Sequence, residues 1–196
     1  MPVALTTDQS ALAESVAGFA ERHGAREYTR KNTERLKRGE RPDLWADLVA
    51  LGLPGVHLPE QVGGQDGTLD DLAVVIAEAG RALLPGPLLP SVIASTVVAS
   101  ADPDEARDAA LRRFAAGGTG AVVLPQHAVR LSDGAEPRLS GVTGPVLGAA
   151  AAESFLVAAT EESGAVCGWF LLERNTPGVE VEIQDGVDLR RDIAVV

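Results

Sequence analysis

Cysteine, lysine and aromatic residues are scarce in this sequence. Among 196 residues there is one cysteine, Cys167, and aromatic residues make up 4% of the chain. A single cysteine excludes an internal disulfide, and the cysteine and histidine residues do not have the spacing of a structural zinc site. We therefore expect neither a disulfide framework nor a metal centre.

Long hydrophobic runs and an excess of basic charge are missing as well. No stretch approaches the roughly 20 apolar residues that span a membrane, and no basic leader precedes an apolar segment at the N-terminus. The formal net charge is -11, which disfavours a surface that neutralises nucleic-acid phosphates. These absences predict a cytoplasmic protein that binds neither nucleic acid nor membrane.

The first part of the chain, residues 1–118, carries the periodicity of helices. Thr6 and Gln9 form a capping-box pattern ahead of an apolar stripe, which predicts a helix over about residues 7–23. Four further helices are expected, with starts at Pro42, at Thr68, after Pro90 and at Asp102, the predicted N-cap of a last helix that ends near Gly117. Residues 1–118 are therefore predicted to form an all-helical domain.

A stripe of basic side chains covers residues 22–41. Eight basic residues stand against three acidic ones in this stretch. A phosphate-bearing ligand or a partner would suit such a stripe, but a solvated helix face explains the pattern more simply. We assign no site to it.

After Gly117-Gly118 the periodicity changes to that of β-strands. Short β-rich runs separated by turn residues cover residues 121–124, 129–131, 155–159, 166–172, 179–183 and 193–196. Residues 119–196 are therefore predicted to form an antiparallel β-barrel-like domain, which makes the fold class α+β. Trp169 is expected in the barrel core, and Cys167 of the same strand is expected to be buried and inert.

A series of short motifs in the helical part resembles the acyl-CoA dehydrogenase family. The order and spacing of the whole series are specific, whereas any one motif alone would be weak. The motifs are Leu44-Trp45, Leu51-Gly52-Leu53, Leu58-Pro59-Glu60-Gln61-Val62-Gly63-Gly64, Glu78-Ala79-Gly80-Arg81 and Pro87-Leu88-Leu89-Pro90. The β part resembles the family more loosely, at Leu139-Ser140-Gly141, Ala152-Glu153, Thr176-Pro177-Gly178-Val179 and Asp188-Leu189-Arg190-Arg191.

The resemblance implies oxidation of an acyl-CoA thioester to its α,β-unsaturated form with FAD as cofactor. In the family, a carboxylate removes the proton α to the thioester while the β-hydride passes to the flavin. The carboxylate usually comes from a C-terminal helical bundle, which has no counterpart in this sequence, so no residue is assigned as the catalytic base. Glu60 belongs to a loop motif that is architectural in the family.

The positions that usually contact the flavin depart from the family pattern. Ala121 replaces the usual aromatic residue and Leu124 the usual threonine, and residues 143–147 lack the aromatic and hydroxyl side chains of a second contact segment. Backbone groups of Leu124, Gln126 and Leu147 are therefore the candidate cofactor contacts. Each unmet polar group of a buried flavin would cost about 1–3 kcal/mol, so several such losses would weaken binding by orders of magnitude.

Substrate and partner assignments also come from the resemblance. Val92, Ile93 and Thr96 are candidate substrate-binding residues at the acyl end of a tunnel. Without the bundle, the apolar faces that normally meet it are expected to be exposed, which predicts association. We expect a homo- or hetero-oligomer with a chain that carries the bundle, and FAD that is bound together with that partner chain.

Three interpretations remain open. The leading one is a subunit or portion of an acyl-CoA dehydrogenase-like flavoprotein. The second, motivated by the apolar Leu124 and Leu147, is a non-catalytic structural subunit of a heteromeric acyl-CoA dehydrogenase with a degenerate flavin site. The third is a fragment of a longer protein, because the last predicted strand still runs at Val196. The sequence identifies neither the acyl group nor the electron acceptor.

Overall fold

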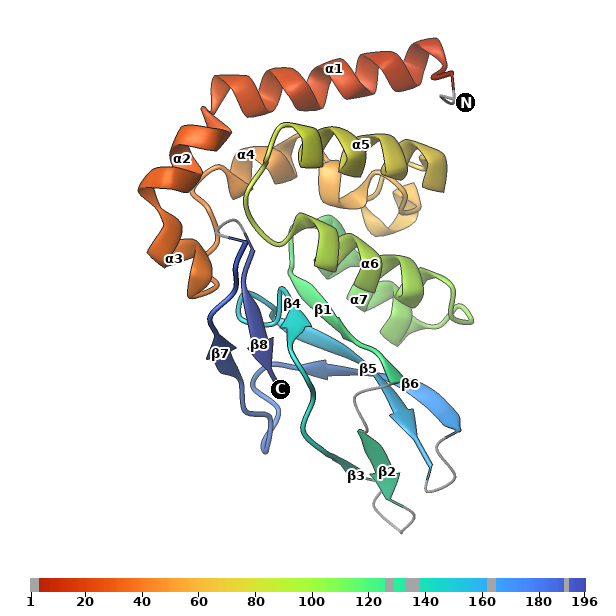
Figure 1. Ribbon diagram of the computed structural model, residues 1–196. Helices are drawn as coiled ribbons and strands as arrows, with labels where there is room; N and C mark the ends of the chain where they lie inside the picture. Colours follow the sequence, from red (N-terminus) through yellow and green to blue (C-terminus); the bar gives the residue numbers. More distant parts are fainter. Residues whose placement is uncertain (1–3, 126–128, 133–137, 162–164, 189–190) are drawn as a thin grey trace.

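A computed structural model shows helices stacked above two small β-sheets (Figure 1). It describes residues 4–125, 129–132, 138–161, 165–188 and 191–196. The chain changes from helices to strands between Ala115 and Gly120, which confirms the α+β fold class. The division into two domains at residue 118 stays a prediction.

The helices form the upper layers of the molecule. They are α1 (Thr7–Arg22), α2 (Ala25–Lys31), α3 (Thr33–Lys37), α4 (Trp45–Ala50), α5 (Leu69–Arg81), α6 (Leu88–Ala99) and α7 (Glu105–Ala115), with 3₁₀ turns η1 (Leu53–Gly55) and η2 (Glu60–Val62). In the described part of the chain, no helix has both the length and the apolar character to cross a membrane.

Side-chain caps set the starts of α1, α5 and α7, whereas α2, α3, α4 and α6 begin without one. The helices predicted to start at Pro42 and after Pro90 begin at Trp45 and Leu88 instead. Thr6 and Thr68 each accept a hydrogen bond from the backbone three residues ahead, and both form complete capping boxes. The predicted N-cap Asp102 is wrong: Asp104 caps α7 by accepting from the Arg107 amide at 2.6 Å. Asp104 itself still has an extended backbone, so the helix begins two residues later than Pro103 indicated.

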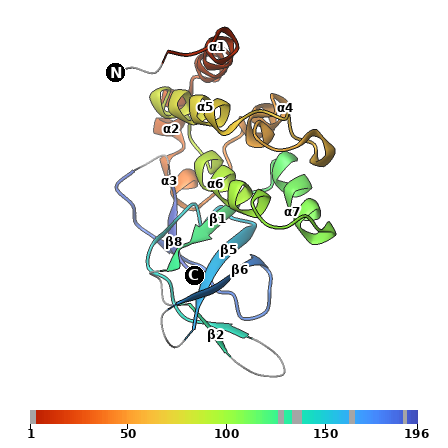
Figure 2. The same ribbon diagram turned by 90° about the vertical axis from the view of Figure 1, so that its right-hand side faces the viewer.

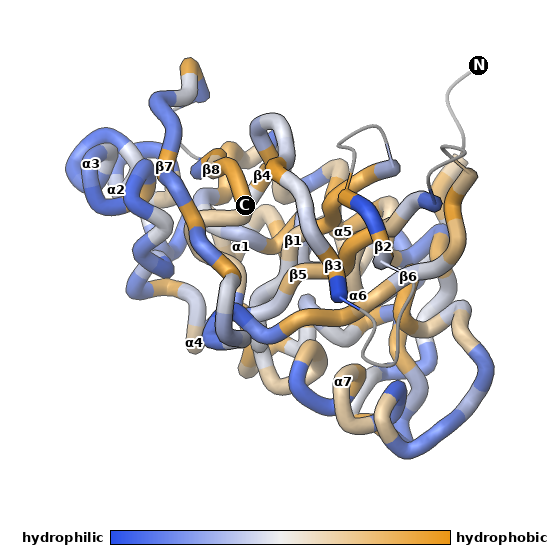
Figure 3. Tube along the Cα trace, turned by 90° about the horizontal axis from the view of Figure 1, so that it is seen from below, coloured by the Kyte–Doolittle hydropathy of each residue, from blue (hydrophilic) through white to orange (hydrophobic). Residues whose placement is uncertain are grey.

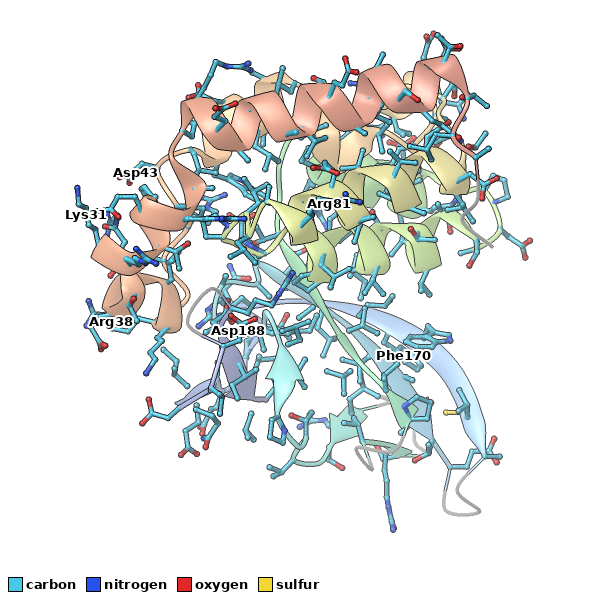
Figure 4. All side chains as sticks on the ribbon, turned by 45° about the horizontal axis from the view of Figure 1, so that its top comes forward. Lys31, Arg38, Asp43, Arg81, Phe170 and Asp188 are labelled. Carbon is cyan, nitrogen blue, oxygen red and sulfur yellow. The ribbon has the colours of Figure 1, made fainter. Side chains whose placement is uncertain are left out.

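The basic stretch 22–41 folds as a corner of short helices and their connections. Gly24 adopts a left-handed conformation that separates α1 from α2. Most of the basic side chains of residues 22–41 pair with carboxylates, as Arg35 does with Glu40 at 2.8 Å. Lys31 and Arg38 lie on the outer side of this corner (Figure 4), and α2 and α3 are largely hydrophilic (Figure 3). A solvated, ion-paired surface accounts for the stripe.

The helical core lies between α1, α4, α5 and α6. Val16 and Phe19 of α1 are fully buried against a cluster that includes Leu48 and Val75. α1 is the outermost layer, α5 lies beneath it, and α6 and α7 lie next to the strands (Figure 2). The apolar stripe predicted for the first helix is therefore a core face.

The strands form two sheets. They are β1 (Gly120–Val123), β2 (Arg130–Ser132), β3 (Arg138–Ser140), β4 (Val146–Leu147), β5 (Ser154–Thr160), β6 (Val166–Glu173), β7 (Glu182–Gln184) and β8 (Ile193–Val195). One sheet has the order β1-β5-β2-β3 with β6 paired to β5, and the other has the order β4-β8-β7.

The prediction of an antiparallel barrel needs correction. β1 pairs with β5 in parallel, and so does β2 at Arg130 and Thr160, so the larger sheet is mixed. The sheets of the described residues do not close into a barrel. Parallel pairing needs a long crossover, which the segment between β1 and β5 supplies. The alternation of apolar and polar residues within one strand does not show which distant strand it pairs with, or in which direction.

β5 is the central strand, and all seven of its residues are buried. Leu156 faces the cluster formed with α6 and α7, whereas Phe155 and Val157 face the cluster shared with the second sheet. Because successive side chains point to opposite faces, a strand covered on both sides reads as a continuous apolar run.

The edge strand β6 departs from prediction. Trp169 is 43% exposed and Cys167 is exposed, although both were expected to be buried. Trp169 lies opposite Ala158, and Leu171 lies opposite Leu156, which faces the helices. Residues paired across two strands point to the same face, so the side chains of Trp169 and Leu171 also point to the helix-covered face. Among the described strands β6 pairs with β5 alone, so Trp169 lies at the edge of the sheet and its indole is only partly covered.

Two glycines let α6 lie close to the sheets. A Cβ at Gly120 would stand 2.7 Å from the Phe114 ring and 3.1 Å from Ala94. Gly148 has a positive φ of 76°, and its Cβ would stand 2.4 Å from Pro90 at the start of α6. Ser91 Oγ also accepts a hydrogen bond from the Gly120 amide at 3.1 Å. The helical and β parts therefore meet along α6.

A charged clamp holds the turn that follows β4. Arg174 Nη1 donates to three carbonyl oxygens of residues 149–152 at 3.0–3.1 Å. Asp192, only 6% exposed, accepts from the amides of Ala150 and Ala151. Burial raises the pKa of Asp192, while these amide hydrogen bonds act in the opposite direction. The turn has its backbone polar groups satisfied by side chains.

We predict that Arg174→Ala destabilises the protein by about 2 kcal/mol, because carbonyls of the turn lose a charged donor. The free energy of unfolding from urea denaturation measures this effect. Arg112→Ala is the matched control, since both arginines are exposed but Arg112 pairs with the exposed Glu105 carboxylate, so its loss should cost about 0.5 kcal/mol or less. Equal losses in the two variants would contradict the clamp.

Candidate functional site

The structure brings together the three elements that carry the predicted site residues. α6 packs against β1, and β1 lies next to β4. Leu124 follows the end of β1 and is 45% exposed, while Leu147 on β4 is half-buried. Gln126 lies outside the described residues. We refer to Ile93, Thr96, Leu124 and Leu147 together as the α6–β1–β4 face; that they share one surface is a prediction from the resemblance.

The three predicted substrate residues of α6 lie in different surroundings. Val92 is 1% exposed and belongs to the helical core. Ile93 is 43% exposed, and Thr96 is half-buried with its hydroxyl donating to the Val92 carbonyl at 2.7 Å. Ile93 and Thr96 are therefore the residues of this helix that a substrate would reach first.

Leu147 offers main-chain groups at the edge of its sheet. The Gly148 amide donates to the Asp192 carbonyl at 2.9 Å, so Gly148 and Asp192 form a hydrogen-bonded pair. Hydrogen-bonded and non-hydrogen-bonded pairs alternate along antiparallel strands, so the next pair, Leu147 and Ile193, is not hydrogen-bonded. The N–H and C=O of Leu147 therefore point away from β8. This geometry makes Leu147 a possible backbone contact of the kind expected from the sequence.

The side chains of this region do not fit the polar edge of a flavin ring. Leu124 and Leu147 are aliphatic, and Ala121 is fully buried. The Thr143 hydroxyl is already committed, since it donates to the Gly144 carbonyl at 2.7 Å and accepts from the Val196 amide at 2.9 Å. Main-chain groups are the donors and acceptors that this face retains for such a ligand.

A partly buried histidine, His57, contacts a buried serine of α6. Ser95 Oγ is 3.1 Å from His57 Nε2, and Ser95 is fully buried. His57 Nδ1 is buried without a hydrogen-bond partner in the described part of the chain. Burial lowers the pKa of His57, which favours the neutral ring. Sequence reasoning missed this pair because its members are 38 residues apart and carry no motif.

The described residues provide no cluster that could hold a metal ion. No carboxylate among them is assigned as a catalytic base. No group of three or more histidine, cysteine or acidic side chains within them is arranged to hold a metal. Glu60 is exposed, and its amide donates to Asp66 Oδ1 at 3.1 Å within the loop. The chemistry of this face is therefore that of an apolar surface with main-chain polar groups.

Comparison with known sequences identifies relatives of the helical part. The family description "Acyl-CoA dehydrogenase, N-terminal domain" matches residues 6–118. The chain is 35% identical over 105 residues to acyl-CoA dehydrogenase FadE34 of Mycobacterium tuberculosis, covering 50% of this chain and 15% of that protein. It is 36% identical over 126 residues to acyl-CoA dehydrogenase IpdE2 of the same species, covering 62% of this chain and 38% of that protein.

Comparison with solved structures extends the likeness to the strands. The Tcur3481-Tcur3483 steroid ACAD G363A variant has a TM-score of 0.72 and 27% identity, covering 95% of this chain and 55% of that chain. The ChsE4-ChsE5 complex of M. tuberculosis has a TM-score of 0.81 and 23% identity, covering all of this chain and 54% of that chain, and supports the fold alone. The chain therefore spans about half the length of these structures.

The partly buried His57 predicts a loss of stability at low pH. Its folded-state pKa lies below the unfolded value, so the unfolded chain binds more protons as the pH falls below about 6.5. The free energy of unfolding should therefore decrease with falling pH until the folded-state pKa is passed. His57→Gln keeps a polar side chain without a titrating ring, so its unfolding should show a weaker dependence between pH 7 and pH 5. Identical pH dependence in both proteins would refute the assignment.

Proposed function

The chain belongs to the acyl-CoA dehydrogenase family, and we propose that it supplies the helical and β portions of an acyl-CoA-oxidising flavoprotein. The observation that carries this proposal is the family match over residues 6–118, followed by strands in the arrangement of the family's solved structures. The reaction proposed for the assembled protein is α,β-dehydrogenation of an acyl-CoA thioester. We place this protein in the cytoplasm.

The flavin site is completed by polypeptide beyond these 196 residues. The α6–β1–β4 face exposes Ile93 and Leu124, two large apolar side chains that a packed protein would cover. A helical bundle on a partner chain or in a longer form of the protein would cover this face and supply the base and the ring contacts. A structural neighbour with 27% identity, the Tcur3481-Tcur3483 steroid ACAD G363A variant, is named for two components, which supports an oligomer.

In this proposal, the residues of this chain bind the substrate and FAD and exclude water, and they do not take part in the chemical step. Ile93 and Leu124 are apolar, so they would hold the acyl portion of the substrate and exclude water from the reacting carbons. The main-chain groups of Leu124, Gln126 and Leu147 would contribute hydrogen bonds to FAD. No proton transfer is assigned to a side chain of this chain, because the described face carries no suitable carboxylate.

We predict that the isolated chain, incubated with FAD and then gel-filtered, retains far less than one flavin per chain. Leu124→Thr and Leu147→Thr each restore a hydroxyl at the predicted ring edge, and each should tighten FAD binding about fivefold, equivalent to about 1 kcal/mol. Visible absorbance of the retained flavin, together with equilibrium dialysis, measures both effects.

Val142→Thr is the matched control, since Val142 is 75% exposed and lies ahead of β4. It should leave FAD binding unchanged. Stoichiometric flavin on the parent chain would show that its backbone groups suffice and would overturn the need for a completing polypeptide. A threonine variant that binds no better than Val142→Thr would remove Leu124 or Leu147 from the site.

The activity itself is tested on the complex that forms around a tagged copy of the chain in its source cells. With acyl-CoA and an artificial electron acceptor, a flavin-containing complex should reduce the acceptor and form the α,β-unsaturated thioester. A complex that contains both flavin and this chain but oxidises no acyl-CoA would refute the proposed reaction.

A further inference from the structure

A groove of about 640 Å³ lies between the C-terminal half of α6, α7 and the edge strand β6. The ends of α6 and α7 stand beside β6 in Figure 1. Leu156 and Ala110 are buried residues of its lining, and Trp169 and Leu171 line it from β6. None of the residues of the α6–β1–β4 face lines this groove, so it is a separate feature of the molecule.

Trp169 gives the groove an aromatic wall. Its side chain points to the helix-covered face of β6, together with Leu171, and yet remains 43% exposed. Phe170, the next residue along β6, points to the opposite face (Figure 4). An indole in an apolar concavity offers a flat surface on which a ring stacks, and covering it removes a large apolar area from water.

The charges of the groove select against an anion. Two guanidinium groups line it, and each is already paired: Arg113 with Glu173 at 2.6 Å, and Arg107 with Asp108 at 2.8 Å. Arg107 also donates to the Ala99 carbonyl at 2.9 Å.

Three carboxylates line the groove as well, those of Asp102, Asp104 and Glu173. They outnumber the two lining guanidinium groups by one, so the groove is not a basic site. A polyphosphate such as that of coenzyme A would meet repulsion here.

We propose that the α6–α7–β6 groove binds an uncharged, flat and predominantly apolar ring compound that stacks on the indole of Trp169. The volume matches the range of about 300–1,000 Å³ that small-molecule sites occupy. The paired arginines close the polar end of the groove, and the apolar floor receives the ring. The proposal does not depend on FAD binding or on acyl-CoA oxidation.

The test titrates the full chain with Nile red, a neutral ring dye whose emission increases in apolar surroundings. Dye emission should rise to saturation at one dye per chain, and the anionic dye ANS should bind more weakly. Trp169→Ala removes the stacking surface, and Ala106→Trp places a bulky ring on the lining of the groove. Each variant should weaken Nile red binding about tenfold or more.

Val166→Ala is the matched control, because Val166 is on the same strand, is 47% exposed and does not line the groove. It should bind the dye as the parent does. Circular dichroism and urea unfolding confirm that each variant is folded before its binding is compared.

Three outcomes would overturn the proposal. The first is binding that does not saturate, or that weakens equally in Val166→Ala, which would mean adsorption to any apolar surface. The second is tighter binding of ANS than of Nile red. The third is a parent chain that is dimeric in sedimentation and becomes monomeric with Trp169→Ala, which would mean that a second copy covers the groove.

Discussion

The close approach of α6 to the sheets is the contact on which the rest of the structure depends. At Gly120 a side chain would collide with the Phe114 ring of α7 and press on Ala94 of α6, and at Gly148 it would collide with Pro90, so glycine lets α6 lie directly on β1 and on the turn after β4. Ser91 adds a buried hydrogen bond to the Gly120 amide. The helical core and the strand core thereby share one helix, and burial of apolar surface on both of its sides stabilises the arrangement.

This contact also places the two surfaces to which function is assigned. Ile93 and Thr96 bring α6 to the face that β1 and β4 complete, and Val97 and Val98 bring its C-terminal half to the groove beside Trp169. The first surface is assigned from the family relationship as a proposal, and its side chains lack the polar groups that the family pattern has there. The second surface has its own shape and charge, and its indole remains open to solvent. α6 thus lies between the face for which a protein partner is proposed and the groove of small-molecule size.

Features with a local physical cause could be predicted from the sequence, and features that depend on distant neighbours could not. The capping boxes at Thr6 and Thr68 are local, and both were predicted correctly. The parallel pairing of β1 with β5 depends on a long crossover, so strand alternation could not reveal it. The exposure of Trp169 depends on the position of β6 at the edge of the sheet, beside the groove that α6 and α7 form with it. The His57–Ser95 contact depends on where the loop that carries His57 packs against α6. Neither residue belongs to a sequence pattern that predicts this packing.

Hydrogen exchange of Gly120→Val tests the role of the α6 contact most directly, with Gly80→Ala as control because the space around Gly80 is open. If α6 and the sheet form one cooperative unit, the valine variant should lose amide protection in α6, β1 and β5 together, and the control should keep it. Loss of protection confined to β1, with α6 and β5 unchanged, would contradict the account.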